Sequence, residues 1–335
     1  MSIESIIKKT SDKISLTIDE TEILFREIMI GNLSDEILKK ILINLSNKGE
    51  SIEEITGGAK VLREKSTKVF VTGDLIDTCG TGGDGKNTIN ISTASALVLA
   101  SMGHKVAKHG NRSISSKSGS ADVLETLNID INLNSESVKD SINNKNFAFM
   151  FAPNFHSAMK NVANARKELK KRTIFNLLGP LCNPANVKRQ CIGVFSLDIL
   201  EKYINVLKNL NTTKAWVFHS YDGLDEISIF DKTKVFELKN NNINSFEIDP
   251  FEIIENKYNF KEIVGGDAEY NAKKILEVFD GKDGALLDII SLNIAAGLIV
   301  LDQFSSIRES FIFAKKHIKS GIVLNYYNKI KKWTY

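Results

Sequence analysis

The sequence has little that would place it outside the cytosol or on a nucleic acid. It has only three cysteines, Cys79, Cys182 and Cys191, without a CxxC spacing, which suits a reducing cytosol and gives no support to a zinc site. The longest apolar run, near residues 294–301, is too short to span a membrane, and the N-terminus lacks a signal-peptide pattern. The net charge of +3 gives no basic field for nucleic acid. We therefore expect a cytoplasmic protein without membrane or nucleic-acid partners.

The first 68 residues have the pattern of helices alone. Apolar residues recur at helical spacing in segments 2–13, 21–30, 34–48 and 51–66, as in amphipathic helices. Ser51 and Glu54 have the spacing of a capping box, which marks the start of the last segment. We therefore expect a small all-helical N-terminal domain over residues 1–68.

From residue 69 onward, short β-branched runs alternate with helical patterns. The expected strands are 75–78, 105–108, 147–151, 190–193, 215–219, 226–230 and 234–238. The expected helices are 92–102, 120–127, 155–171, 197–210, 271–279, 289–303 and 306–320. The asparagine-rich segment 239–255 is expected to be an irregular surface excursion. This alternation predicts an α/β domain over residues 69–335, with a mostly parallel central sheet flanked by helices.

A glycine-rich loop, residues 77–93, follows the first expected strand and precedes a helix. Such loops lie at the carboxyl ends of strands, where α/β sheets bind ligands, and their glycines let backbone N–H groups approach an anion. Four polar residues stand near the helix start: Thr88, Asn90, Ser92 and Thr93. One of the last three is expected to cap the helix. The polar residues that are not needed for the cap are suited to hydrogen-bond phosphate oxygens, and one hydroxyl could lie near a metal.

Two familiar nucleotide-binding patterns fit this loop poorly. Gly80, Gly82 and Gly85 match the dinucleotide fingerprint, but the region about twenty residues further on is basic where that motif needs an acid. The Walker A pattern fails at Asn87, because a Ser or Thr is needed there to meet magnesium. A glycine-rich turn without a ligand is the plain alternative.

A second polar loop, residues 108–120, carries three cations, Lys108, Arg112 and Lys117, among small residues. Taken alone it could be a solvated basic loop. Beside the first loop in a parallel sheet, its cations are better explained as neutralising a multiply charged phosphate. His109 and Asn111 would then face the reacting group. Together the two loops predict a site for a phosphorylated sugar.

An acidic turn at residues 222–226 follows the expected strand 215–219. Adjacent Asp225 and Glu226 repel one another unless a cation lies between them. Magnesium takes one or two carboxylates and completes its octahedron with water and substrate phosphates, and the EF-hand spacing of a calcium site is absent. An isolated acidic turn is usually only a turn, but next to two phosphate loops it indicates a metal site. Arg166, among the lysines of helix 155–171, would by itself be part of a solvated face.

These residues closely resemble the anthranilate phosphoribosyltransferase family of tryptophan biosynthesis, in the nucleoside phosphorylase-like class of phosphoribosyltransferases. The resemblance spans nearly the whole chain and is most specific in residues 80–85 and 108–112, which read Gly-Thr-Gly-Gly-Asp-Gly and Lys-His-Gly-Asn-Arg. Other matching stretches are 30–35, 48–51, 121–125, 151–156, 172–184, 222–226 and 265–272. Ser220 stands where glycine is common and Cys182 where threonine or another residue is usual, and we expect neither to affect the chemistry.

The resemblance implies a nucleoside phosphorylase/phosphoribosyltransferase-like fold in which the helical domain, completed by helices near 155–185, forms homodimers. It implies that 5-phosphoribosyl 1-pyrophosphate (PRPP) is bound by Gly80, Gly83, Asp84, Thr88, Asn90, Ile91, Ser92, Thr93, Lys108, Ser113, Ser115, Ser116 and Ser120. It implies that two Mg²⁺ ions are held by Ser92, Asp225 and Glu226. It further implies that anthranilate contacts Gly80, His109, Asn111, His156 and Arg166.

The implied reaction transfers the phosphoribosyl group of PRPP to the amine of anthranilate and releases pyrophosphate. The amine is already neutral and nucleophilic at pH 7, so the difficult step is the departure of pyrophosphate. That departure would be stabilised by magnesium, Lys108 and the amides of residues 80–85. Arg166 would hold the anthranilate carboxylate and align the amine, and either His109 or pyrophosphate itself would take the amine proton.

Two alternatives remain at this point. A pyrimidine nucleoside phosphorylase has similar domains, but the carboxylate pair at 225–226 and the basic loop at 108–112 argue against it. A non-catalytic, nucleic-acid-binding relative of the same fold would have lost the metal carboxylates and gained a basic stripe. Here the carboxylates are present and the net charge is only +3.

Overall fold

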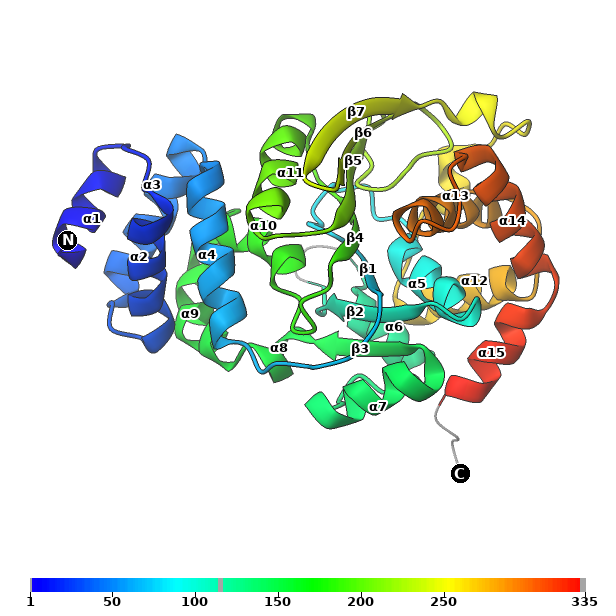
Figure 1. The fold of residues 1–335 in the computed structure, drawn as a ribbon, viewed down its shortest axis with the longest axis horizontal. Coiled ribbons are helices and arrows are strands. Elements are labelled where there is room, and N and C mark those ends of the chain that lie inside the picture. Colours follow the sequence, from blue (N-terminus) through cyan, green and yellow to red (C-terminus); the bar gives the residue numbers. More distant parts are fainter. Residues whose placement is uncertain (1, 114–116, 332–335) are drawn as a thin grey trace.

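The computed structural model describes residues 2–113 and 117–331. The chain begins with a bundle of helices (Figure 1). The bundle consists of α1 (Ile3–Ser11), α2 (Ile18–Ile30), α3 (Asp35–Lys48) and α4 (Ile52–Lys65). Each starts at a Ser or Thr whose side chain accepts a hydrogen bond from the first turn, which satisfies a backbone N–H that lacks a helical partner. The four predicted helices are confirmed, and so is the capping box of Ser51 and Glu54.

Seven strands form one sheet in the order β3-β2-β1-β4-β5-β6-β7. Five neighbouring strands are parallel: β3 (Phe147–Phe151), β2 (Lys105–Gly110), β1 (Leu75–Gly80), β4 (Arg189–Gly193) and β5 (Lys214–Ser220). Two antiparallel strands complete the edge: β6 (Thr233–Lys239) and β7 (Asn242–Ile248). The predicted fold class, a helical part followed by a mostly parallel α/β part, is therefore confirmed.

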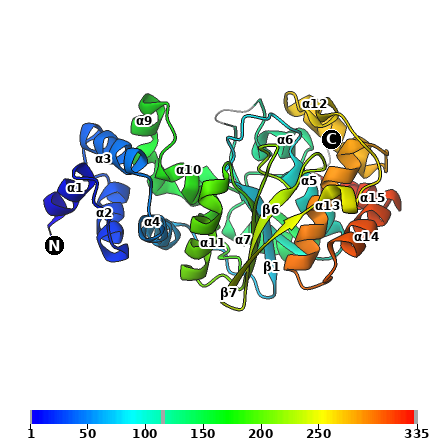
Figure 2. The ribbon, with the colours of Figure 1, turned by 90° about the horizontal axis from the view of Figure 1, so that it is seen from above.

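Helices cover both faces of the sheet (Figure 2). One face packs against α5 (Ile91–Ser101), α6 (Ser120–Thr126), α12 (Ala268–Phe279), α13 (Ala285–Val300), α14 (Ile307–Lys319) and α15 (Ile322–Ile330). On the other face lie α7 (Ser135–Lys145), α8 (Ala152–Phe155), α10 (Ile174–Leu178) and α11 (Leu200–Asn209). The bundle lies beyond them, where α4 contacts α10 and α11, and α9 (Lys160–Leu169) packs against α2 and α3. Strand β3 shows the alternation, because Phe147 and Phe149 enter the first core while Ala148 and Met150 face α7. None of the described helices is long and apolar enough to cross a membrane.

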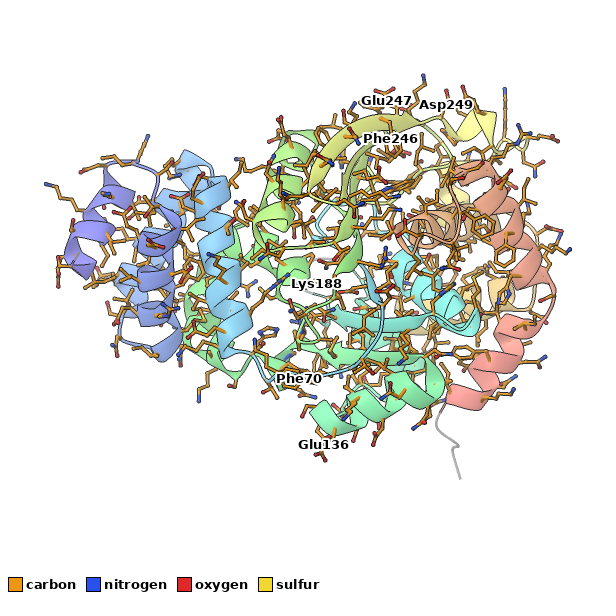
Figure 3. The ribbon with its side chains drawn as sticks, in the orientation of Figure 1. Phe70, Glu136, Lys188, Phe246, Glu247 and Asp249 are labelled. Atoms are coloured by element: carbon orange, nitrogen blue, oxygen red, sulfur yellow. The ribbon has the colours of Figure 1, made fainter. Side chains whose placement is uncertain are left out.

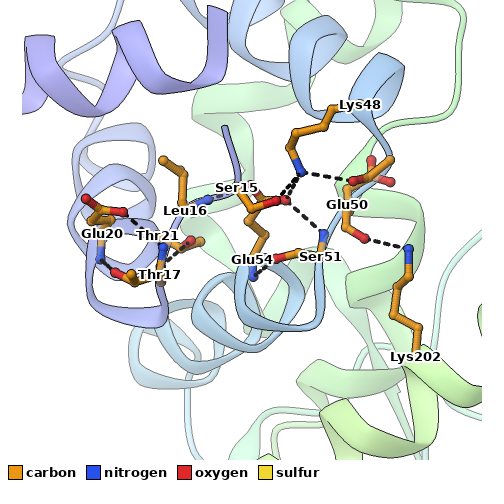
Figure 4. Close-up of polar contacts among 11 residues, drawn as sticks. Ser15, Leu16, Thr17, Glu20, Thr21, Lys48, Glu50, Ser51, Glu54 and Lys202 are labelled. Carbon is orange, nitrogen blue, oxygen red and sulfur yellow. Dashed lines mark hydrogen bonds and ion pairs between the residues drawn. The ribbon is translucent and has the colours of Figure 1, made fainter. Parts of the chain in front are cut away.

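Glu54 is a buried charge that stabilises the bundle and its junction with the α/β part (Figure 4). Its carboxylate accepts a hydrogen bond from the N–H of Ser51 at 2.9 Å and pairs with the ammonium of Lys48 at 2.8 Å. One turn away, Lys202 of α11 donates to the carbonyl of Glu50 at 2.8 Å. Removal of Lys48 would leave the buried charge of Glu54 uncompensated, so this pair stabilises the bundle, while the bond from Lys202 joins the bundle to α11.

Two parts of the sheet differ from the prediction. Residues 226–230 form no strand, because the N–H and C=O of Ile227 bond to the side chain of Asn293. Segment 239–255, predicted to be irregular, contains β7. Phe246 lies on β7 (Figure 3). It packs edge-on against Trp216 of β5, with ring centroids 5.2 Å apart. The strand was missed because an edge strand carries one polar face, and asparagine hides the alternation.

Some helix predictions also need correction. Helices α7 and α15 were not predicted. The segment expected as one helix over 155–171 contains a 3-10 turn (Ser157–Met159) followed by α9, and a separate short helix, α8, ends at Phe155. Helices α12 and α13 begin three and four residues before their predicted starts, at Ala268 and Ala285. The other predicted helices and strands are confirmed with small shifts at their ends, where caps rather than periodicity decide the boundary.

Three neighbouring parallel strands, β1, β2 and β4, end at glycine. Gly80 pairs with Gly193, and Gly110 pairs with Phe151 at the end of β3. The loops that leave these strands therefore start from one edge of the sheet. This edge brings together the motifs that the sequence singled out.

Candidate active site

The acidic turn lies against the first loop because two glycines leave room for it. A Cβ atom at Gly193 would lie 1.6 Å from the carbonyl oxygen of Asp225, and one at Gly80 would lie 3.0 Å from Asp225 Oδ2. In the first turn of α5, the N–H of Ser92 donates to Glu226 Oε1 at 3.1 Å. The acidic pair and the first loop therefore form one site.

Three carboxylates, Asp84, Asp225 and Glu226, influence one another here. Desolvation and the nearby charge of Asp84 raise the pKa of Asp225 to about 7. Desolvation and the charge of Asp225 raise the pKa of Glu226 well above its ordinary value, and Lys108 opposes this shift. Asp84 Oδ2 is buried and has no hydrogen-bond partner among the described residues. Carboxylates held this way repel one another unless a cation joins them.

A magnesium ion fits these residues. Within residues 2–113 and 117–331, no three His, Cys, Asp or Glu side chains form a group that could hold a metal by themselves. Magnesium does not need such a group, because it usually keeps waters and takes phosphate oxygens from its substrate. The unpartnered Asp84 oxygen and the raised pKa values of Asp225 and Glu226 are features that a divalent cation would relieve.

Arg172 is a contact of the first loop that the sequence did not reveal. Its guanidinium donates to the carbonyl of Gly83 and lies 3.7 Å from the ring centroid of Phe195. Its own carbonyl accepts a hydrogen bond from the Ser46 hydroxyl of α3 at 3.2 Å. Arg172 thereby links the helical bundle to the glycine-rich loop. The sequence did not single out Arg172, because it follows Lys170 and Lys171 and so looked like one more cation of a solvated basic segment.

The start of α5 contradicts the expectation of a side-chain cap. Asn90 is the N-cap residue but makes no capping hydrogen bond, and Ser92 and Thr93 lie inside the helix. The Asn90 side chain instead donates to the carbonyl of Ser118 at 3.2 Å, which connects the first loop to the second. Among the other predicted residues, Ile91 and Thr93 are buried. Thr88 forms an isolated β-bridge with Val264.

The second loop begins with a buried lysine. Lys108 is 2% exposed, and its ammonium donates to the carbonyl of Thr78 at the end of β1. Its charge also lowers the pKa values of Asp77 and Glu226 against the effect of their burial. Lys108 is thus a buried cation whose charge acts on two carboxylates of the site, Asp77 and Glu226.

Arg112, which the sequence suggested as a cation for a phosphate, is paired with two carboxylates in the structure. It forms ion pairs with Asp122 at 2.8 Å and with Glu125 at 2.9 Å. The other oxygen of Asp122 accepts hydrogen bonds from the N–H groups of Ser113 at 3.2 Å and Gly119 at 2.9 Å. Asp122 therefore shapes the second loop and neutralises its arginine.

Two further predicted residues of this loop contact each other, and two cannot be placed. The hydroxyl of Ser120 donates to the carbonyl of Asn111 at 3.3 Å. Ser115 and Ser116 lie outside the described residues.

Two histidines lie together behind the second loop. The rings of His109 and His156 have centroids 5.1 Å apart. Desolvation lowers the pKa of His109 to about 3 and that of His156 to about 4, so both rings are neutral near pH 7. His109 Nδ1 lies 3.2 Å from the carbonyl oxygen of Gly179, which assigns the proton to Nδ1. The Nε2 atoms of both rings are buried without a hydrogen-bond partner in the described part of the chain.

Arg166 differs from the lysines around it on α9. Its guanidinium lies 5.3 Å from the ring centroid of Phe175, and desolvation lowers its pKa. The segment that carries Phe175 also supplies the carbonyl of Gly179 to His109. Residues 174–182 therefore contact both Arg166, through Phe175, and His109, through Gly179.

The bundle and the sheet domain together define a two-domain glycosyl transferase. Residues 4–66 match the glycosyl transferase family, helical bundle domain, and residues 72–324 match the glycosyl transferase family, a/b domain. Within this class the chain belongs to the anthranilate phosphoribosyltransferase family. It is 50% identical to the anthranilate phosphoribosyltransferase of Pelagibacter ubique over 95% of this chain and 96% of that protein. It is 46% identical to that of Petrotoga mobilis over 96% of this chain and 93% of the relative.

Solved structures agree with this assignment. The anthranilate phosphoribosyltransferase of Thermus thermophilus superposes with a TM-score of 0.91 at 35% identity, covering 97% of this chain and 98% of that one. The Saccharomyces cerevisiae enzyme in complex with PRPP and Mg has a TM-score of 0.90 at 26% identity, covering 98% and 96%. The family resemblance and the enzyme class expected from the sequence are confirmed.

Proposed function

We propose that this chain uses the site to transfer the phosphoribosyl group of PRPP to the amine of anthranilate, in the tryptophan pathway of the cytoplasm. The observation that carries the proposal is the hydrogen bond between Ser92 and Glu226 at 3.1 Å, because it joins a phosphate loop to a carboxylate pair. The neighbour from Saccharomyces cerevisiae was solved with PRPP and Mg, and another structure of that enzyme with 4-fluoroanthranilate.

In this proposal PRPP lies along both loops at the carboxyl edge of the sheet. Its phosphate oxygens receive hydrogen bonds from backbone N–H groups and hydroxyls, since glycine and helix N-termini suit anions. The contacting residues are Gly80, Gly83, Asp84, Thr88, Asn90, Ile91, Ser92, Thr93, Lys108, Ser113, Ser115, Ser116 and Ser120. Lys108 contributes a buried positive charge that favours the departing pyrophosphate.

Two Mg²⁺ ions would be held by Ser92, Asp225 and Glu226, together with PRPP. When bound, magnesium would offset the negative charge that grows on the departing pyrophosphate. The protein's own part is to hold Asp225 and Glu226 at the first loop through Gly193 and the N–H of Ser92.

Anthranilate would lie against the wall formed by Gly80, Asn111, His109, His156 and Arg166. Arg166 would hold its carboxylate and aim its amine at the ribose. The neutral rings of His109 and His156 would shield the amine from water. A pKa of about 3 makes His109 a weak base, so we assign the amine proton to a pyrophosphate oxygen. Lys108, His109 and Arg166 are thus the proposed catalytic residues.

We further propose that residues 1–68, completed by helices near 155–185, form the homodimer contact. Two isoleucines one above the other on α2, Ile23 and Ile30, are 38% and 54% exposed. A symmetric partner would cover such side chains. The remaining residues 69–335 would form the phosphoribosyl-transfer domain.

One assay tests the proposed function. Anthranilate, PRPP and magnesium are mixed with the protein, and the loss of anthranilate fluorescence is followed. We expect PRPP-dependent loss, and no phosphorolysis of thymidine in a parallel assay. Thymidine cleavage without anthranilate consumption would instead favour a nucleoside phosphorylase.

A further inference from the structure

Asn271 on α12 lies far from the substrate loops in sequence, yet it is 1% exposed and bonds to Asn90 of the first loop. Asn90 in turn bonds to Ser118 of the second loop. We propose that Asn271 is a positioning residue that fixes the two substrate loops relative to each other by orienting Asn90. The proposal rests on the proposed function, since it assumes that the two loops bind PRPP.

The contact is a relay of hydrogen bonds across three segments. The N–H of Gly266 donates to Asn271 Oδ1 at 2.8 Å, and Asn271 Nδ2 donates to Asn90 Oδ1 at 2.9 Å. Asn90 Nδ2 then donates to the carbonyl of Ser118 at 3.2 Å. The relay begins at a backbone donor, the N–H of Gly266, and ends at a backbone acceptor, the carbonyl of Ser118. Only one orientation of the two amides satisfies every bond, so the relay fixes the direction of Asn90.

The beginning of the relay is rigid, because its backbone packs directly on the first loop. The N–H of Ile89 donates to the carbonyl of Ile263 at 3.0 Å, and the N–H of Gly265 donates to that of Asn87 at 2.7 Å. A Cβ atom at Gly265 would lie 2.6 Å from the Thr88 carbonyl oxygen. The segment before α12 therefore serves as a fixed support from which Asn271 reaches Asn90.

An Asn271→Asp substitution separates orientation from packing, because the side chain keeps its shape. An ionised carboxylate accepts from Gly266 but cannot donate to Asn90, so Asn90 must turn its NH₂ toward it and point its oxygen at the Ser118 carbonyl. The link to the second loop is then lost. Because the position is 1% exposed, burial should raise the pKa of the introduced carboxyl. A protonated carboxyl donates to Asn90 again, so lowering the pH should restore the relay.

The test compares the Asn271→Asp variant with the wild-type protein. We expect the KM for PRPP to rise about tenfold at pH 8, the effect of one lost buried hydrogen bond. The KM for anthranilate at saturating PRPP should change less than about twofold, and the PRPP defect should shrink at pH 6 relative to wild type. In the ligand-free protein, hydrogen exchange of the amides at 117–122 should accelerate. This last readout needs no substrate, so it distinguishes failure of the relay from failure of the proposed function.

Asn161→Asp is the matched control, because Asn161 is partly buried and donates to the carbonyl of Met29 at 2.7 Å in the helical part. It should lower thermal stability without raising the KM for PRPP or changing exchange at 117–122. If Asn271→Asp folds poorly, Asn271→Ser, which is smaller and keeps a donor, is measured in its place and should show a weaker defect. The proposal is overturned if the Asn271 variant loses stability only, with both KM values and the exchange at 117–122 unchanged.

Discussion

His109 and His156 place their rings 5.1 Å apart in a buried part of the site, and neither ring is charged near neutral pH. Desolvation holds the pKa of His109 at about 3 and that of His156 at about 4. Their Nε2 atoms are buried and have no hydrogen-bond partner among the described residues. The two rings are therefore buried and neutral near pH 7, and they do not act as an acid–base couple.

The lowered pKa values predict a loss of stability in acid. The unfolded chain takes up protons on both histidines as pH falls below about 6.5, while the folded protein does so only near pH 3–4. The contribution of these two histidines to stability is therefore fully present above pH 6.5 and is lost as pH falls from that value toward their folded pKa values. At pH 5 each histidine costs up to about 2 kcal/mol.

Urea unfolding at pH 7.5 and pH 5 checks this prediction. The carboxyl groups with raised pKa values act in the opposite sense, so the variant and the wild type are compared. Replacing both residues, His109→Gln with His156→Gln, should make the change in unfolding free energy from pH 7.5 to pH 5 more favourable than in the wild type by about 2–4 kcal/mol. An equal change in variant and wild type would show that these rings are protonated in the folded protein.

Arg166 is predicted to recognise the anthranilate carboxylate. A charge-assisted contact is worth about 1.5–3 kcal/mol, so Arg166→Ala should raise the KM for anthranilate about ten- to a hundredfold and that for PRPP much less. Arg166→Lys should recover only part of the affinity for anthranilate, because the single charge of an ammonium cannot reproduce the two parallel hydrogen bonds of a planar guanidinium. Lys167→Ala, an exposed cation on the same helix, is the control and should be nearly silent. Equal effects of Arg166→Ala on both substrates would move Arg166 to the phosphate site or to packing.

The helical part is predicted to carry the dimer contact. Ile23→Glu with Ile30→Glu places charges on the exposed face of α2 and should convert the dimer to monomers, because a buried unpaired charge is costly at an interface. Light scattering measures the mass. Ile312→Glu, at an isoleucine that is 57% exposed on α14, should leave the dimer intact. A strictly monomeric and fully active wild type would count against the prediction.

Much of the fold could be predicted from the sequence because periodicity and turn chemistry are local. The strands that end at Gly80 and Gly110 are short β-branched runs before glycine-rich loops, and α4 is marked by Ser51 and Glu54. Strand β7 was missed because its stability comes from Phe246 packing on Trp216, a contact made across the sheet. Residues 226–230 looked like a strand because the bonds of Ile227 to Asn293 leave no local signal.

The site was predictable where a residue's chemistry is unusual by itself. Paired carboxylates and basic glycine-rich loops are such cases. The ion pairs of Arg112 could not be predicted, because its partners Asp122 and Glu125 face it only after α6 forms. Arg172 and Asn271 were missed as site residues because their effects pass through Gly83 and Asn90, and partners so distant in sequence become visible only in the structure.

The central claim is that Asp225 and Glu226 act with magnesium on PRPP, and one measurement tests it most directly. Anthranilate fluorescence is followed across a magnesium titration for the wild type and for the double variant Asp225→Asn with Glu226→Gln, with circular dichroism as the check on folding. We predict that the wild type consumes anthranilate only with magnesium, and that the folded double variant is nearly inactive at every magnesium concentration. Undiminished turnover by the double variant, or by the wild type without magnesium, would contradict the account.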